Sequence, residues 1–197
     1  MLYYENARDA LMSKSIACRL DEFMQVKWSG GRRFEINLVA TNPFWQGQAA
    51  VEVIAQVVRE FYFPTAIPVG GMSFGMRHKT LESVFENVGN VESGFVATLR
   101  ARGGSVVNPS IRNEVLGREL RLNYTMQPDD EIVITSNLQE KRVIINGQNG
   151  FRFLDAGVTR FFYIQVGTNR IGYRADENVG NLGVGVRYIP NFTFAEG

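Results

Sequence analysis

The chain has 197 residues, of which 45% are hydrophobic and 21% are charged, and this size fits one medium domain or a small domain with an appendage. Its 21 basic and 20 acidic residues leave a net charge of +1, so nucleic acid and anionic membranes are poor candidates for its partners. The single cysteine, Cys18, excludes an internal disulfide framework. The first residues lack the continuous apolar core of a secretion signal, and no stretch has the ~18 apolar residues that predict a membrane-spanning helix. We therefore expect synthesis in a cytoplasm and no membrane partner.

The first segments predict a β-hairpin. Residues 13–24 alternate between apolar and polar types, and residues 32–41 alternate more strictly, with Phe34, Ile36 and Leu38 on one face. The sequence WSGG at residues 28–31 supplies the turn between them. A lone hairpin is barely stable in water, so this N-terminal piece needs a partner sheet.

The next segment favours a short helix and a connector. Asn42-Pro43 ends the preceding strand, because proline cannot donate a hydrogen bond to the ladder. Apolar residues then recur at helical spacing, at Ala50, Val53, Ile54, Val57, Val58 and Phe61. Their high β-branched content leaves an irregular strand open. Residues 61–71 are expected to be extended, because their two prolines fix the backbone.

The remainder of the chain predicts a run of short strands separated by turns. The expected strands span residues 94–102, 118–124, 130–135, 141–146, 161–166, 169–175 and 183–189. Turn sequences such as NPS, QPDD, NGQNG and GTN lie between them. Strands at such regular spacing indicate an antiparallel sandwich or barrel, so the fold class is mostly β.

One short motif resembles a catalytic one. Residues 71–75, GMSFG, match the G-x-S-x-G elbow of serine hydrolases, with Ser73 as the nucleophile. That mechanism needs an acid and then a histidine later in the chain, but the only histidine, His78, follows five residues after Ser73. We interpret the motif as a chance match in a glycine-bounded strand and expect Ser73 and His78 to be dispensable.

Metal and cofactor sites also lack a signal. With one histidine and one cysteine, only an all-oxygen site for calcium or magnesium remains, and residues 127–131, QPDDE, group three acids. Pro-Asp-Asp is equally an ordinary turn. Gly180, Gly183 and Gly185 follow no Walker A or Rossmann spacing. We therefore predict no catalytic residue, no metal, no cofactor and no enzymatic activity.

Sugar binding is the alternative function that the residues leave open. Lectin sandwiches stack a sugar on an aromatic ring, but Trp28 and Trp45 lie outside the predicted sandwich. Phe161 and Tyr163 share one face of a strand and Phe162 takes the other, so part of this aromatic set belongs to the core. A carbohydrate-binding β-sandwich module that recognises a surface or cell-wall glycan stays the second hypothesis.

Taken in order, several segments resemble the distal tail (Dit) protein family of siphophages and related prophages. The combination is N-P-F-W, then F-P-x-x-I-P, then G-N-V-E-S-G, then N-P-x-I-x-N, then G-x-N-x-I. In this chain those motifs begin at Asn42, Phe63, Gly89, Asn108 and Gly167. The resemblance covers nearly the whole chain.

The resemblance implies a virion structural protein of the tail tip or baseplate. It implies the C-terminal part of a ring-forming belt domain at residues 1–47, a connector at residues 48–85 and a galectin-like β-sandwich at residues 86–197. It further implies a ring of six copies that joins the tail tube protein to a tail-associated lysin, fibre or receptor-binding protein. Compared with the family, this chain lacks most belt strands, and its sandwich lacks the histidine and tryptophan that galectins use for sugar.

Overall fold

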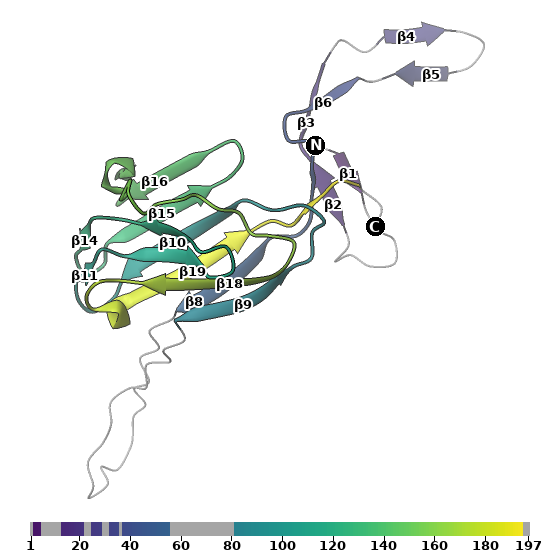
Figure 1. The fold of residues 1–197 in the computed structure, drawn as a ribbon. Helices are drawn as coiled ribbons and strands as arrows, with labels where there is room; N and C mark the ends of the chain where they lie inside the picture. The colour runs from purple at the N-terminus through teal and green to yellow at the C-terminus, as the bar shows by residue number, and fades with distance from the viewer. Residues whose placement is uncertain are drawn as a thin grey trace, which may run out of the picture.

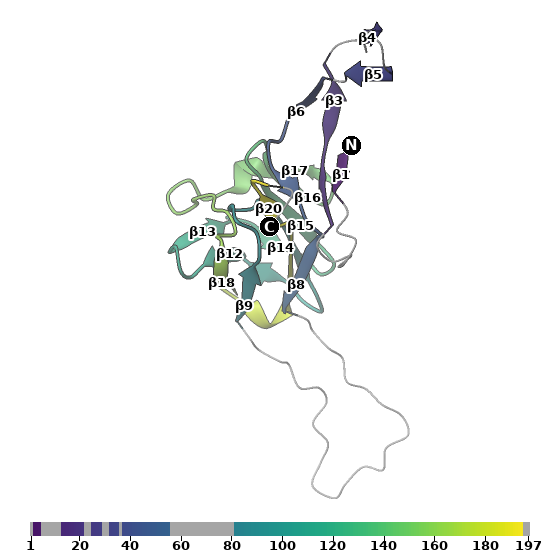
Figure 2. The ribbon, with the colours of Figure 1, turned by 90° about the vertical axis from the view of Figure 1, so that its right-hand side faces the viewer.

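The structure, a computed structural model, describes residues 2–4, 13–21, 25–28, 32–35, 37–55 and 81–194. Two antiparallel sheets stack as the layers of a sandwich in this part of the chain (Figures 1 and 2). The larger sheet has the strand order β17 (Gln148–Asn149), β16 (Lys141–Ile145), β15 (Glu131–Ser136), β10 (Phe95–Ala101), β19 (Leu182–Tyr188) and β8 (Ala50–Ala55). The smaller sheet has the order β13 (Arg118–Arg121), β12 (Ser110–Asn113), β18 (Gly167–Arg174) and β9 (Glu82–Asn87). The predicted fold class is confirmed.

Short elements close the ends of the sandwich. Strands β11 (Val106–Val107) and β14 (Thr125–Met126) pair with each other. Two 3-10 helices, Phe151–Phe153 and Val179–Asn181, lie in the connections. These elements lie in the crossovers between the two sheets and add no strand to either of them.

The core lies between the two sheets. Strand β10 alternates strictly, with Phe95, Ala97 and Leu99 fully buried and Val96 and Thr98 half-buried on the other face. The ring of Phe95 lies 4.9 Å from that of Phe162, which is also fully buried. Buried aliphatic residues of both sheets complete this core, so the sandwich supplies its own apolar interior.

The helix expected over residues 50–61 is wrong where the structure describes it. Residues 50–55 form strand β8, which pairs antiparallel with β19 from Ala50↔Tyr188 to Ala55↔Val184. The physical reason is the β-branched run, which packs better on a pleated sheet than on a helix. Residues 56–61 lie outside the described part.

The strand pairing also changes the expected organisation of residues 48–85. Both β8 and β9 come from this predicted connector, yet each forms an edge strand of a sandwich sheet. Phe85 of β9 is buried and stacks on Tyr188 with ring centroids 5.4 Å apart. The sandwich therefore recruits strands from before residue 86.

Two further differences concern the sandwich itself. Residues 161–166 keep the predicted alternation of burial, but they join no ladder and make a single bridge, Ser93↔Ile164. Residues 110–113, expected in a turn region, form strand β12 at the centre of the smaller sheet. The other predicted strands match observed ones to within a few residues.

The N-terminal residues form the predicted hairpin, in two parts. Strand β3 (Cys18–Leu20) pairs with β6 (Leu38–Ala40), and farther out β4 (Gln25–Trp28) pairs with β5 (Arg32–Glu35). Figure 1 shows this hairpin projecting away from the sandwich. At its base, a small sheet has the order β1 (Leu2–Tyr4), β2 (Lys14–Ile16), β7 (Trp45–Gln46) and β20 (Asn191–Phe192).

Buried polar groups tie this small sheet to the sandwich. The backbone nitrogen of Asn191 donates to Ser93 Oγ at 3.1 Å, and its side chain donates to the carbonyl of Glu92 at 3.2 Å. Thr193 donates from its backbone to Asn90 Oδ1 at 2.8 Å. Strand β20 is thus held by the sandwich on one side and by β7 on the other.

Candidate interaction surface

A short segment at the base of the hairpin crosses the end of the larger sheet. Asn42 Oδ1 accepts a hydrogen bond from the backbone of Phe44 at 3.2 Å, which forms a compact Asx turn around Pro43. Gln139 Nε2, in the loop between β15 and β16, donates to the carbonyl of Thr41 at 3.1 Å. We call residues 41–46 the strap.

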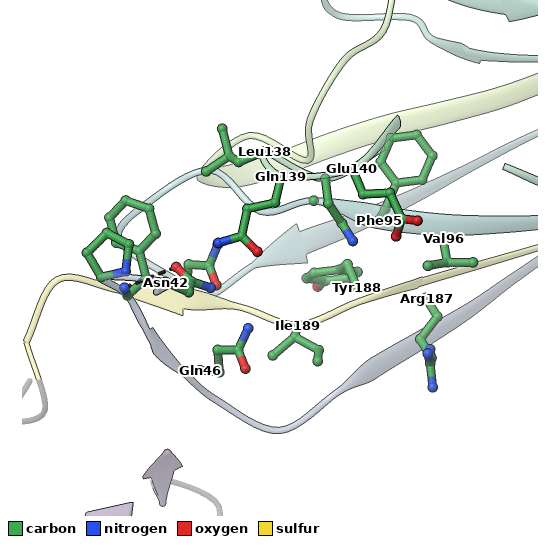
Figure 3. Close-up of a pocket in the computed structure, with 15 residues that line it drawn as sticks. Asn42, Gln46, Phe95, Val96, Leu138, Gln139, Glu140, Arg187, Tyr188 and Ile189 are labelled. Atoms are coloured by element: carbon green, nitrogen blue, oxygen red, sulfur yellow. Dashed lines mark hydrogen bonds between the residues drawn. The ribbon is translucent and has the colours of Figure 1, made fainter. Parts of the chain in front are cut away.

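A cavity of about 490 Å³ lies between the strap and the sheet (Figure 3). Its walls come from the strap, from the start of β10, from residues 137–140 and from the end of β19. Phe95 and Tyr188 are buried beneath it, whereas Leu138, Glu140 and Arg187 are exposed at its margin. This strap pocket is within the size range of ligand sites.

The polar groups of the strap pocket are incompletely paired. Glu140 Oε1 lies 3.2 Å from Arg142, but Arg187 has no acidic partner among the described residues. The side-chain amides of Gln46 and Asn137 likewise have no hydrogen-bond partner in the part of the chain that the structure describes. The pocket thus presents one positive charge and several groups that donate and accept.

A band of aliphatic and small residues continues from the strap pocket across the outer face of the larger sheet. Its members are directly paired on neighbouring strands: Ile144↔Val133, Val133↔Thr98 and Thr98↔Gly185. All four residues are half-buried, and Gly185 contributes no side chain. We call this row the outer-face stripe; Val96, two residues before Thr98 on the same face, connects it to the pocket.

The outer face of the smaller sheet differs, because an ion-pair cluster occupies part of it. Glu114 lies between Arg112, with Nε at 3.3 Å, and Arg174, with Nη2 at 3.2 Å. Its carboxylate packs over Gly172, where an added Cβ would lie 2.9 Å from Glu114 Oε1. Here the glycine makes room for an ion pair, so this face is organised by internal contacts.

A second charge cluster on the same side pins two loops to β13. Arg121 Nη2 donates to Asp176 Oδ2 at 2.6 Å, and Asn108 donates to the same oxygen at 2.8 Å. The hydrogen bond with Asp176 raises the pKa of Arg121, and the same bond lowers the pKa of Asp176. Asp155 adds a contact 3.7 Å from Arg121 Nε. This arrangement stabilises the loops and leaves no acid poised for proton transfer.

Among the residues singled out from the sequence, those that the structure describes do not gather into a site. Ser73 and His78 lie outside the described residues. Asp130, within QPDDE, has a turn role: it accepts bonds from the backbone of Gln127 at 2.8 Å, from Asn146 at 2.7 Å and from Tyr124 at 3.2 Å. No group of three or more His, Cys, Asp or Glu side chains is placed to hold a metal ion in the described ranges.

The same turn shows how local hydrogen bonds shift the pKa of a carboxyl group. Burial raises the pKa of Asp130, but the hydrogen bonds from Gln127, Asn146 and Tyr124 outweigh it, so the net pKa is lowered. Burial and the nearby Asp130 carboxylate raise the pKa of Tyr124. Both groups hold the loop between β14 and β15 against the β16–β17 turn.

The aromatic set 161–163 divides as the alternation predicted. Phe162 is fully buried, and Phe161 is half-buried and stacks on the exposed Phe151 with ring centroids 6.1 Å apart. Lys141 Nζ lies 5.5 Å from the centre of the Phe161 ring. The ring that could receive a sugar is therefore already covered on one side by Phe151.

Sequence reasoning missed the strap pocket and the outer-face stripe. Asn42, Gln139 and Arg187 are far apart in the chain, and only strand pairing brings their segments together. One signal was available: the motif NPFW combines a turn former with two aromatic residues directly after a strand. Such a turn has to pack its aromatic side chains against something.

Comparisons with known proteins agree on one group. The sequence model for "Siphovirus-type tail component, C-terminal domain" matches residues 88–192. The crystal structure of the Dit protein of phage SPP1, described as a paradigm of the hub adsorption apparatus in phages that infect Gram-positive bacteria, superposes with a TM-score of 0.64 at 10% identity. That match covers 94% of this chain and 62% of the SPP1 chain.

A second solved structure and two negative findings complete the comparison. A chain of the phage P2 baseplate in its activated conformation with Ca matches with a TM-score of 0.48 at 12% identity, over 92% of this chain and 66% of that chain. The chain thus spans less than two thirds of the length of these relatives. A search of curated proteins found no match. Within the described residues, no helix has the length and apolar character needed to cross a membrane.

Proposed function

Because this chain belongs to the family of siphovirus-type tail components, we propose that it is part of the tail-tip hub that joins the tail tube to the host-recognition proteins. The match over residues 88–192 carries this proposal, since it covers all of the sandwich except the edge strands β8 and β9, and the fold is also that of SPP1 Dit. A structural role in a phage tail follows from the family. The hub position, the tail tube protein and the lysin, fibre or receptor-binding protein as partners are our inference.

The role we propose is exerted through protein contacts and involves no catalysis. The sandwich offers large faces beside a projecting hairpin, and three of its described acids, Asp130, Asp176 and Glu114, are held in a turn and in ion pairs. Catalytic acids and bases are instead usually found in clefts, with pKa values shifted toward neutrality. Ser73→Ala and His78→Ala variants are expected to retain assembly.

We further propose that the hairpin is the C-terminal part of a belt region and that the chain works within a homo-oligomeric ring. Leu20 and Leu38 face each other across β3 and β6 and are 53% and 41% exposed, which leaves apolar surface for another copy. A ring closes when one head-to-tail interface repeats through a closing rotation. The hairpin alone is small, so we expect weak self-association of the purified chain.

Reconstitution tests this function. The chain is mixed with the tail tube protein of its own phage, and assemblies are examined by light scattering and negative-stain electron microscopy. Rings stacked on tube ends are the expected result. A tube that assembles fully and ends identically with or without the chain would contradict the hub position.

A further inference from the structure

We propose that the strap pocket and the outer-face stripe together bind one extended segment of a neighbouring protein, in which a large apolar side chain lies next to a carboxylate. The inference deepens the hub role and rests on it, because it assigns one face of the sandwich to a partner. The bound segment crosses β10, β15 and β19 and anchors its apolar side chain beneath the strap.

The shape of the surface favours an extended chain. The outer-face stripe runs across four neighbouring strands, from Ile144 on β16 to Gly185 on β19, and adjoins the pocket through Val96. Strands in a sheet lie about 4.8 Å apart, so the row is long and narrow. Gly185 adds no side chain to this row, and a glycine lets another backbone approach more closely than a larger residue does.

The polar lining matches a peptide backbone. A side-chain amide carries one acceptor oxygen and an NH2 donor, which is the same pairing that each peptide group offers. Gln46 and Asn137 present such amides at the pocket without partners among the described residues, and Gln139 already binds a backbone carbonyl, that of Thr41. An apolar ligand would leave these groups unpaired, which is costly when they are covered.

The charge of the surface predicts that the bound segment carries a carboxylate. At the margins of the face, opposite charges neutralise each other in two ion pairs, Arg142–Glu140 and Arg100–Glu131. Arg187, exposed between the pocket and the stripe, keeps a guanidinium without an acidic partner in the described part of the chain. A guanidinium binds a carboxylate with two parallel hydrogen bonds, so one acid on the segment fixes its register.

A saccharide fits the same lining less well. Sugar recognition uses an exposed aromatic face, whereas Tyr188 and Phe95 are buried beneath the pocket and Phe44 in the strap is half-buried. The apolar stripe would also remain uncovered by a compact ligand. A glycan is therefore the competing outcome of the test.

The test is a selection of random dodecapeptides on the immobilised full chain. We expect enrichment of peptides with Asp or Glu within two residues of Leu, Ile or Phe. The Arg187→Glu variant is expected to enrich Lys or Arg at that position instead. In titrations, Arg187→Ala and Leu138→Ser should each weaken the selected peptide at least about tenfold, since each removes an anchor of the interface.

Matched controls lie on the opposite sheet. Arg170→Glu and Leu81→Ser change exposed side chains of the same types there and should leave the peptide affinity within about twofold. Thermal melting of each variant confirms that the fold is retained, and Arg187→Gln replaces any charge variant that fails to fold.

Several results would overturn the docking face. They are no enrichment, equal affinity for Arg187→Glu and the unchanged chain, or loss with Arg170→Glu as large as with Arg187→Ala. Saturable binding of disaccharides from a cell-wall panel, abolished by Leu138→Ser, would replace the peptide with a glycan. If the face fails while the chain still caps tail tubes, the hub role stands without it; if the chain does not cap tubes but binds the peptide, the hub role falls alone.

Discussion

The sandwich and the N-terminal hairpin satisfy the same sheet-forming rules with opposite outcomes for burial. In the sandwich, alternate residues of every long strand enter a shared core that includes Phe95, Leu99 and Phe162. Among the side chains of the hairpin and its base whose burial the structure describes, Ile16 is the buried apolar one, whereas Leu20, Leu38 and Val39 are exposed. Strand pairing alone therefore gives a ribbon with exposed apolar side chains. A stable domain also needs a second layer that covers the apolar face. We therefore expect the hairpin to be the part that depends on partners.

Among the tests of this comparison, shortening the chain is expected to change stability the most. A fragment of residues 48–197 keeps β8, β9 and the whole core, so it should melt cooperatively. A fragment that begins at residue 86 loses β8 and most of β9, including Phe85, and we expect it to lack a cooperative transition. Circular dichroism against temperature measures both. An equally sharp melt of the shorter fragment would show that the edge strands add little.

A single core substitution should give the next largest effect. Phe162→Ala removes a fully buried ring that packs 4.9 Å from Phe95, and we expect a loss of about 3–5 kcal/mol in the free energy of unfolding. Phe151→Ala, at a ring that is 46% exposed, should lose less than about 1 kcal/mol. Urea unfolding of both variants provides the comparison. Similar losses would mean that the aromatic stack outside the core matters as much as the core.

The exposed pair of the hairpin should affect association and not stability. The double substitution Leu20→Ser and Leu38→Ser is expected to change unfolding by at most about 0.5 kcal/mol, while it reduces concentration-dependent self-association seen by light scattering. Val115→Ser, at a residue that is 66% exposed on the sandwich, is the matched control. A stable, concentration-independent hexamer that tolerates the hairpin changes would instead place the ring contacts on the sandwich.

The smallest expected effect is on the stability of the fold at acidic pH. The folded state lowers the pKa of Asp130, so this group contributes stability above its unfolded pKa of about 3.9 and loses it as the pH falls through the lower folded value. Asp130→Asn is expected to flatten the stability profile below about pH 4 and to leave its shape near neutrality unchanged. Urea midpoints between about pH 2 and 7 report this. An identical acid slope in both proteins would assign it to other carboxylates.

The sequence predicted the fold class and most sandwich strands because their alternation is local. The prediction failed where one apolar pattern fits both a helix and a strand. Val53 and Ile54 suit either structure, and only pairing with the open edge of β19 decides between them. Ile111 was hidden because Pro109 and Asn113 mark turns, although β18 and β13 flank its strand on both sides. Arg187 carried no signal, since its lack of an acidic partner among the described residues depends on what lies across the folded sheet.

The link between hairpin and sandwich has a mechanical consequence. Strand β7 meets β2 through the single pair Ser15↔Gln46 and meets β20 through two pairs, whereas β10 and β19 share seven. Tension applied along the hairpin loads this short ladder first, and few hydrogen bonds share the load at once. The ladder would therefore part before the longer pairings of the sandwich do, so the first structural response to such strain would occur at the root of the hairpin.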